Sequence, residues 1–367
     1  MRTKIRHVMG ISGGKDSAAL AIYMKDKYPE LDIEYYTCDT GMELGETYKL
    51  IDNLEVYLGK RIIRLAAADK SEELPFDHFL KMYGGFLPSS NSRWCTKVLK
   101  LFPFERFVGS DPVVSYVGIR GDEDREGYIS RKSNIQSIFP FRKNIWSEDV
   151  ISKVLFNGSI STILSLFEKS NSTNAEKIRE ILQKPISISF DQKQKLNLLL
   201  GLGVKEFNTL VFSFLKATDY PLSKEEYFPL IDNEDVLVRD DIFSILETSG
   251  VGVPEYYKGV QYSVDDKIGV YSRSRSGCYF CFFQQKIEWI WLYEQHPELF
   301  KKAMEYEKDG YTWMQEEKLE ELLIPERMNK IKNDFLKKTE KKRDVQSPYL
   351  LDILDEEEEV GCASCFI

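Results

Sequence analysis

A glycine-rich stretch near the N-terminus holds the residues best suited to bind phosphate. Residues 8–17 read VMGISGGKDS, a glycine pair followed by lysine, aspartate and serine. Glycines let the backbone approach an anion closely, and a helix that begins there directs its first N–H groups at the anion. Serine hydroxyls add donors, and lysine adds a positive charge. The predicted loop consists of Ser12, Gly13, Gly14, Lys15, Asp16 and Ser17.

The residue after the lysine separates two kinds of phosphate loop. A Walker A loop has Ser or Thr there, because that hydroxyl holds the magnesium ion. Asp16 occupies this position, so the loop is not of the Walker type. An aspartate would repel an uncompensated phosphate, and it therefore indicates a bound Mg²⁺ or a role at the helix N-terminus. A ligand-free turn is the simpler alternative, but such a turn does not need two serines, a lysine and an aspartate together.

Cysteines form the second group of residues that could do chemistry. Cys278 and Cys281 have the C-x-x-C spacing that fits one metal ion or cluster. A second C-x-x-C pair, Cys362 and Cys365, lies near the C-terminus. The two pairs could together hold zinc, or the second pair could carry a persulfide or a redox disulfide, or belong to an inert tail. Cys38 is expected to be a buried strand residue.

The elements around these residues alternate between strand and helix. Apolar, β-branched runs predict strands at 5–11, 32–38, 61–67 and 113–121, and apolar residues at helical spacing predict helices at 15–28, 46–59, 72–83 and 95–107. This alternation predicts an α/β fold with a doubly wound, mostly parallel sheet. Ligands bind at the carboxyl ends of the strands in such sheets, and the loop at 12–17 and the sequences DTG (39–41) and GIRGDEDR (118–125) all follow strands.

The pattern also suggests a division of the chain. We expect a nucleotide-binding α/β core at 1–151, a helical insertion at 152–220, a return to the core with the C-x-x-C segment at 221–300, and a helical region with an acidic tail at 301–367. The stretch 285–335 is expected to be helical and to pack on the core.

Composition limits the kind of protein. The 367 residues are 43% hydrophobic and carry a net charge of −9, so the chain can bury a core and has no overall basic field for nucleic acid. The basic run at 330–343 and the acidic run at 355–359 are best explained as solvated surface. Because no stretch has the length of a membrane span and the N-terminus lacks a signal sequence, we expect a cytoplasmic protein with reduced thiols and no membrane contact.

SGGKDS resembles the pyrophosphate-binding loop of the PP-loop superfamily of N-type ATP pyrophosphatases. More narrowly, the chain resembles the branch that contains phosphoadenosine phosphosulfate (PAPS) reductases and the DndC-like DNA phosphorothioation enzymes. Six further segments, in the same order, are similar to motifs of that branch. They are DTGMELGETYKLIDNLEVYLG (39–59), RWCTKVLKLFPFERF (93–107), GIRGDEDREG (118–127), PFRKNIWSEDV (140–150), VPEYYKG (253–259) and SRSRSGCYFCFFQQKIEW (272–289).

The resemblance implies the fold of the adenine nucleotide alpha-hydrolases (HUP-type) and an ATP chemistry. Activating members cleave ATP between the α and β phosphates, which yields an adenylated substrate and pyrophosphate. The loop at 12–17 would hold the pyrophosphate and Mg²⁺, with Lys15, Asp16 and Arg120 as catalytic residues. The sequence DTG would contact the nucleotide or the metal through Asp39, Thr40 and Gly41. Asp122, Asp124 and Arg125 are weaker candidates, since charged loop residues are usually solvated.

The resemblance also implies a role for Cys95, which could otherwise be a small buried hydrophobic residue. Family members often bring the cysteine of the RWCTK segment and the late C-x-x-C to one 4Fe–4S cluster. Cys95, Cys278 and Cys281 would then be metal ligands, and the fourth ligand would be Cys362, Cys365 or a non-cysteine group. Reductases with a cluster have a double cysteine where this chain has Trp94 and Cys95. Zn²⁺ is the alternative metal.

Three functions follow from these features. The first is an ATP-dependent adenylating enzyme that activates a nucleic acid for sulfur transfer, as in DndC-like DNA modification and phage-defence systems. A sulfur donor such as a cysteine desulfurase and defence-system proteins would be its partners. The second is a sulfonucleotide reductase that uses Cys362 or Cys365, since the chain lacks the family's C-terminal ECGLH motif. The third is a protein that binds a nucleotide without turnover. A basic cluster would suit a polyanion or a phosphosulfate: Arg131, Lys132, Arg142, Lys143, Arg273 and Arg275.

Overall fold

The computed structural model describes residues 4–124, 130, 132–168, 173–308 and 310–343. Arg125, Arg131, Cys362 and Cys365, which the sequence singled out, lie outside the described residues.

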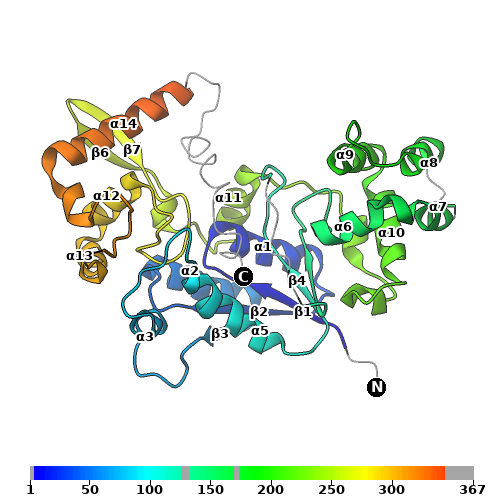
Figure 1. The fold of residues 1–367 in the computed structure, drawn as a ribbon, viewed down its shortest axis with the longest axis horizontal. Coiled ribbons are helices and arrows are strands. Elements are labelled where there is room, and N and C mark those ends of the chain that lie inside the picture. The colour runs from blue at the N-terminus through cyan, green and yellow to red at the C-terminus, as the bar shows by residue number, and fades with distance from the viewer. Residues whose placement is uncertain (1–3, 125–129, 131, 169–172, 309, 344–367) are drawn as a thin grey trace.

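A parallel sheet of five strands forms the centre of the molecule (Figure 1). Its strands are β1 (Arg6–Gly10), β2 (Ile33–Asp39), β3 (Ile62–Ala66), β4 (Val113–Tyr116) and β5 (Ile135–Ile138). Their order in the sheet is β3-β2-β1-β4-β5, and all four pairings are parallel. The chain therefore reverses its direction of travel across the sheet between β1 and β4, the place where such sheets bind ligands. The predicted doubly wound α/β fold is confirmed.

Two details of the sheet differ from the sequence prediction. The fourth strand was expected to reach residue 121, but β4 ends at Tyr116, and the chain beyond it turns so that Ile119 N donates to the Val117 carbonyl. The fifth strand was not expected, because IQSI has two polar residues at its centre. Gln136 is nevertheless buried, and its side-chain oxygen accepts from Leu222 N at 3.1 Å. A hydrogen bond from a distant segment thus satisfies a buried polar group of this strand.

Neighbouring residues of β1 point to opposite faces of the sheet. Met9 packs with the buried faces of α1 (Lys15–Lys27) and α2 (Gly45–Leu58). Val8 packs on the other side, in a cluster with Tyr36 and Phe104 of α5 (Phe102–Val108). Since strand side chains alternate between faces, the consecutive apolar residues Val8 and Met9 of β1 serve both layers. The helices between β3 and β4 that precede α5 are α3 (Pro75–Met82), α4 (Trp94–Thr96) and the π-helix η1 (Lys97–Leu101).

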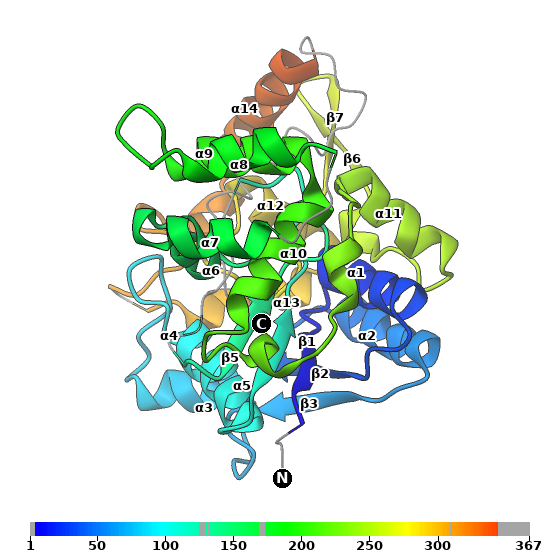
Figure 2. The ribbon, with the colours of Figure 1, turned by 90° about the vertical axis from the view of Figure 1, so that its right-hand side faces the viewer.

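A lobe of helices rises on one side of the sheet and faces the viewer in Figure 2. It contains α6 (Glu148–Leu155), α7 (Ile160–Phe167), α8 (Ala175–Gln183), α9 (Gln192–Leu202) and α10 (Val204–Leu215). Buried apolar residues of the lobe and of the sheet belong to one continuous hydrophobic cluster. A buried hydrogen bond from Trp146 Nε1 to Asn208 Oδ1, 2.9 Å long, fixes α10 against the segment that follows β5.

A second lobe rises on the opposite side (Figure 1). It contains the antiparallel hairpin of β6 (Val260–Val264) and β7 (Lys267–Tyr271), with α12 (Lys286–Gln295), α13 (Pro297–Tyr306) and α14 (Pro325–Arg343). Asp265 and Asp266 form the turn of the hairpin with positive φ, which aspartate tolerates better than most residues. The helix α11 (Arg239–Thr248) packs on α1, and its buried residues Ile242 and Leu246 belong to the hydrophobic cluster of the sheet. Short 3₁₀ turns are η2 (Asn157–Ser159), η3 (Pro221–Lys224), η4 (Pro229–Asp232), η5 (Glu255–Tyr257) and η6 (Leu319–Leu323).

No single helix in the described ranges is long and apolar enough to cross a membrane. Two bent pairs reach the length and composition of a span together, Glu148–Leu155 with Asn157–Phe167 and Gln192–Leu202 with Val204–Leu215. Buried core helices of soluble proteins have the same properties.

The unfolding free energy is expected to depend on the protonation of His7 in β1. Its Nδ1 lies 2.8 Å from the Tyr116 hydroxyl. The pKa of His7 is lowered from 6.5 to about 4, chiefly by burial and also by nearby Lys4, while Asp32 opposes the change. The folded protein therefore keeps a neutral imidazole where the unfolded chain binds a proton, and the unfolding free energy falls as the pH falls from 6.5 toward 4, by at most about 3 kcal/mol.

Urea unfolding at about pH 7 and about pH 5 measures this effect. The His7→Asn variant keeps a polar group near Tyr116 but does not titrate, so its stability should change less between the two pH values. An equal pH dependence in the variant and the original protein would contradict the assignment.

Candidate active site

The predicted phosphate loop connects β1 to α1 at the carboxyl end of the sheet. Its two serines hold the loop together, because the Ser12 and Ser17 hydroxyls lie 3.1 Å apart and Ser17 Oγ also donates to the Gly14 carbonyl at 3.2 Å. Gly13 has a φ of +73°, a conformation that favours glycine, and Gly14 is the N-cap of α1. The loop therefore has the sharp strand-to-helix turn that the sequence predicts.

Segments far along the chain press against both glycines from outside. A Cβ atom on Gly13 would lie 2.2 Å from Thr47 Cγ2, and one on Gly14 would lie 2.5 Å from Ser276 Oγ. The Tyr256 hydroxyl donates to the Gly13 carbonyl at 3.0 Å. Close packing by the protein itself is thus a second reason for the glycines, beside the approach of an anion.

The turn after β4 packs equally closely on the loop. A Cβ atom on Gly118 would lie 2.9 Å from the Asp16 carbonyl oxygen, a backbone atom that cannot move without the loop. We expect Gly118→Ala to lower the unfolding free energy by about 1–3 kcal/mol, the usual cost of overpacking, and to weaken ATP binding by displacing Asp16.

Gly45→Ala is the matched control, since a Cβ atom there would meet nothing within 4 Å. Thermal unfolding and ATP titration of the two variants test the prediction. Equal behaviour of both variants would show that Gly118 does not position the loop.

Lys15 and Asp16 begin α1 with both side chains almost completely buried, at 1% and 6% exposure. Lys15 Nζ lies 3.4 Å from Asp16 Oδ2 and 5.1 Å from the centre of the Tyr257 ring. Burying charges costs free energy unless they are paired, so these two side chains depend on each other and on their neighbours.

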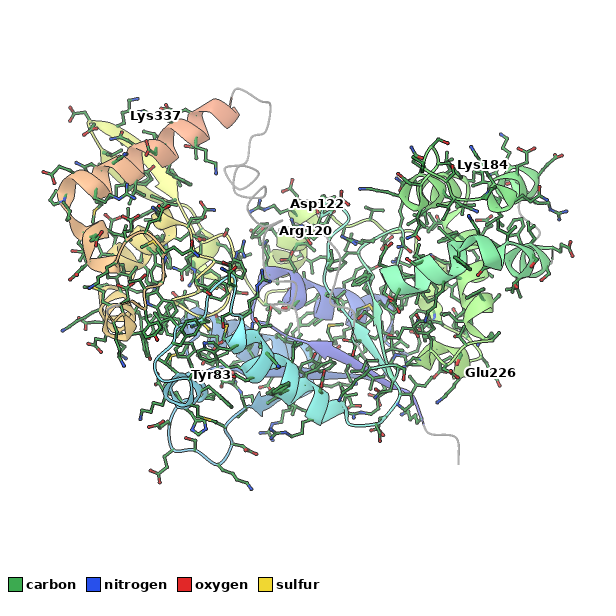
Figure 3. The ribbon with its side chains drawn as sticks, in the orientation of Figure 1. Tyr83, Arg120, Asp122, Lys184, Glu226 and Lys337 are labelled. Atoms are coloured by element: carbon green, nitrogen blue, oxygen red, sulfur yellow. The ribbon has the colours of Figure 1, made fainter. Side chains whose placement is uncertain are left out.

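Arg120 supplies the next charge and links the loop to the turn after β4. Its Nη1 donates to Asp16 Oδ1 at 3.1 Å, and its Nε donates to Asp122 Oδ1 at 2.9 Å. Nη1 also lies 3.0 Å from Glu123 Oε1. Arg120 is 2% exposed, and it lies with Asp122 in the middle of the molecule, between the lobe that carries Lys337 and the lobe that carries Lys184 (Figure 3).

The structure therefore brings together the three predicted catalytic residues Lys15, Asp16 and Arg120 in one buried cluster. With Asp122 and Glu123, the cluster has two cations and three carboxylates, an excess of one negative charge. Mg²⁺ usually binds through one or two carboxylates and substrate phosphates. The protein therefore needs to supply only one carboxylate ligand, such as Asp16, to hold that ion. Glu123 was not among the predicted site residues, although it follows the singled-out Asp122.

The DTG segment lies at the end of β2, beside β1. Asp39 Oδ1 accepts hydrogen bonds from Gly41 N at 2.9 Å and from the Tyr48 hydroxyl at 3.0 Å, so its carboxylate shapes this turn. Thr40 Oγ1 donates to Glu43 at 2.7 Å. Burial raises the pKa of Glu43, and the hydrogen bond from Thr40 opposes that change. Glu43 is a titratable group of the site that the motifs did not point to.

The C-x-x-C segment reaches the same turn. Cys278 Sγ lies 3.3 Å from Thr40 Oγ1, and the backbone of Cys278 bridges that of Glu43. Cys281 N donates to the Cys278 carbonyl at 3.2 Å. Burial raises the pKa of both thiols, so neither is an activated thiolate in this arrangement.

Cys95 packs against the same hydrophobic core as Cys278. However, no group of three or more His, Cys, Asp and Glu side chains in the described part of the chain is arranged to hold a metal ion. Cys95, Cys278 and Cys281 as they lie here therefore do not fit a cluster or a zinc ion on their own, and Cys362 and Cys365 are outside the described residues. Cys38 is buried in β2 as expected, with its pKa raised to about 12 by burial.

Arg273 is the most unusual charged residue near the site. It is 0% exposed, and its Nη2 donates to the Cys278 carbonyl at 3.2 Å. Its Nε and Nη1 have no hydrogen-bond partner among the described residues, and the same is true of the side chains of Ser272 and Gln284. Its backbone N donates to the carbonyl of Tyr256, whose hydroxyl holds the phosphate loop. In the sequence, the alternation of arginine and serine directly before GCYFC was the pattern that could have pointed to Arg273.

Comparison with known proteins gives one family and one relative. A family model for the phosphoadenosine phosphosulfate reductase domain matches residues 6–145. An uncharacterized protein of Methanocaldococcus jannaschii is 33% identical over 146 residues, which cover 36% of this chain and 28% of that protein. The match thus spans less than a third of the relative's length. No solved structure matches.

Proposed function

We propose, from the match of residues 6–145 to the phosphoadenosine phosphosulfate reductase domain, that the protein is an ATP-dependent adenylating enzyme of the PP-loop ATP pyrophosphatase superfamily. It would cleave ATP to AMP and pyrophosphate and activate a nucleic acid for sulfur transfer, as in DndC-like modification and defence systems. The observation that carries the proposal is the buried cluster of Lys15, Asp16 and Arg120 at the point where the strand order reverses.

In the proposed reaction an acceptor oxygen attacks the α-phosphorus of ATP. The new oxygen–phosphorus bond forms while the bond from the α-phosphorus to the bridging oxygen breaks, and pyrophosphate leaves with that electron pair. Any proton on the acceptor oxygen passes to water. Negative charge grows on the bridging oxygen, so fixed cations at that point lower the barrier. Lys15 would meet the departing pyrophosphate, and Arg120 would meet the α-phosphoryl group.

Asp16 and its neighbour Asp122 would hold Mg²⁺ together with the phosphates. Such an ion supplies charge neutralisation of the polyphosphate when it is bound. Both carboxylates touch Arg120, so the guanidinium would keep them oriented toward the site. Asp39, Thr40 and Gly41 would contact the nucleotide from the end of β2.

Incubation with ATP and Mg²⁺, followed by assay of AMP and pyrophosphate, tests the proposal. Both products should form in a one-to-one ratio and should increase when a nucleic acid acceptor is added. Formation of ADP, or no AMP with any DNA or RNA, would rule the proposal out.

The sulfur end of the reaction is proposed to involve the cysteines, with a cysteine desulfurase as donor. A 4Fe–4S cluster or Zn²⁺ on Cys95, Cys278, Cys281 and one of the tail cysteines would need the undescribed residues, and no step is assigned to it. Iron and zinc analysis of the full chain, purified anaerobically, decides the question. Iron lost in Cys278→Ser supports the cluster, stoichiometric zinc rejects it, and absence of both metals removes the metal site.

A sulfonucleotide reductase is the second candidate, because the matching family model is that of the PAPS reductase domain. The unpartnered guanidinium nitrogens of buried Arg273 would suit a sulfo group beside Cys278. Sulfite release from PAPS with thioredoxin would support this function. Its absence, with AMP formed from ATP, would favour the adenylating enzyme.

A further inference from the structure

A hydroxyl group of the second lobe lies directly against the phosphate loop. A Cβ atom on Gly14 would lie 2.5 Å from Ser276 Oγ but 3.4 Å from Ser276 Cβ, so this serine directs its hydroxyl at the loop. Ser276 is half-buried, and its hydroxyl has no hydrogen-bond partner in the part of the chain that the structure describes. The loop therefore has a free hydroxyl beside it that comes from a distant segment.

The segment that carries Ser276, residues 272–277, is fixed on both sides. Ser274 donates from its backbone N and from Oγ to Oε1 of buried Glu288, at 2.7 and 2.9 Å. Directly after the segment, the backbone of Cys278 bridges to the turn after β2. Because the backbone is held at these two points, the serine has a defined place beside the loop.

A buried positive charge lies in the same segment. Arg273 is 0% exposed and forms no ion pair with a described residue, and its Nε and Nη1 have no hydrogen-bond partner there. Burial raises the pKa of the Tyr256 hydroxyl, and the charge of Arg273 opposes that change, so the guanidinium acts on the hydroxyl that donates to the Gly13 carbonyl. A buried charge without a counterion costs free energy. An anion bound at the loop would reduce that cost.

The charges around the loop do not balance those of a bound nucleotide. Lys15 and Arg120 meet three carboxylates there, which leaves one negative charge in excess. ATP with one Mg²⁺ is itself negatively charged, because its phosphate groups carry more charge than the ion neutralises. The site in the core therefore needs another cation and another donor. The segment 272–277 has one of each in Arg273 and Ser276.

We propose that Ser276 is a further nucleotide-binding residue, and that its hydroxyl donates to a phosphate of ATP at the loop. The inference rests on the proposed use of ATP and adds that the second lobe forms part of the phosphate site. A phosphate at the start of α1 would meet the N–H groups of the loop and the serine hydroxyl together. The core and the second lobe would then bind the nucleotide jointly.

Two ligands separate a binding role of Ser276 from a packing role. Isothermal titration of the full chain with ATP and Mg²⁺, and separately with adenosine, compares the original protein with Ser276→Ala. We expect the affinity for ATP to fall about tenfold, since one hydrogen bond to a charged group is lost, and the affinity for adenosine to stay the same. An unchanged affinity for ATP, or an equal loss for both ligands, would overturn the inference.

A carboxylate at the same position gives a second test with a matched control. Ser276→Asp places a negative charge beside the phosphates, so it should weaken ATP binding more than Ser276→Ala does. Ser263 is exposed on β6 of the same lobe, so Ser263→Asp adds the same charge to the hairpin and should leave the ATP affinity unchanged. Circular dichroism verifies the fold of each variant. Equal ATP affinities of the two aspartate variants would overturn the inference.

Because these tests measure binding and not turnover, the inference stays distinguishable from the proposed reaction. Weaker ATP binding in Ser276→Ala would support the binding residue even if the original protein forms no AMP, a result that would end the proposed adenylation alone. Equal ATP binding in Ser276→Ala and the original protein would overturn the inference and leave the adenylation intact. No binding of ATP to the original protein would overturn both.

Discussion

Arg120→Met is expected to abolish AMP formation, with a loss in kcat/KM of at least about 100-fold. Arg120 holds Asp16, Asp122 and Glu123 with one guanidinium, and methionine leaves these carboxylates without it. Removal of one partner from a buried ion pair also destabilises a protein by about 3–5 kcal/mol. The variant should therefore lose both activity and thermal stability.

Two further variants separate catalysis from folding. Arg120→Lys keeps the charge but cannot donate to several carboxylates in a fixed fork, so it should recover stability in part and activity hardly at all. Asp16→Asn added to Arg120→Met removes one uncompensated carboxylate and should raise the unfolding free energy again without restoring turnover. Recovery of activity in step with stability in either variant would show that Arg120 has only a structural role.

Lys15→Met is expected to weaken the binding of ATP with Mg²⁺ by about 10- to 100-fold, the range for one hydrogen bond to a charged group. Methionine keeps most of the buried volume against the Tyr257 ring and removes only the ammonium group. Asp16 retains its hydrogen bond from Arg120, so the fold should be preserved. Isothermal titration with ATP measures the affinity, and circular dichroism verifies the fold.

Lys49→Met is the control for this prediction, since Lys49 is exposed on α2 and is not part of the loop. Its affinity for ATP should equal that of the original protein. Unchanged ATP binding in Lys15→Met would mean that the loop does not use its lysine for phosphate, and the proposed orientation of the nucleotide would have to be abandoned.

The sequence alone was sufficient for the local features of the site. The strand β1, the glycine pair and the helical spacing of α1 all lie within residues 6–27, and each follows from short-range backbone and side-chain preferences. The parallel sheet could be predicted as well, because parallel strands need a long crossover connection, and a helix of suitable length separates most of these strands. The strand β5 and the hairpin β6–β7 were missed, since their short polar sequences are stabilised by neighbours from elsewhere in the chain.

Tertiary structure alone decided which charges meet. Asp16 and Arg120 are 104 positions apart, and their motifs predicted a role for each residue but not the hydrogen bond that joins them. Other features of the site also arise between distant segments. They are the packing of Ser276 and Tyr256 on the predicted phosphate loop and the buried guanidinium of Arg273. Local spacing determines which way a side chain points along its own element, but the partner of a buried charge depends on how the whole chain packs. The sequence was therefore enough to predict the phosphate loop SGGKDS, but it was not enough to predict the ion cluster that surrounds this loop.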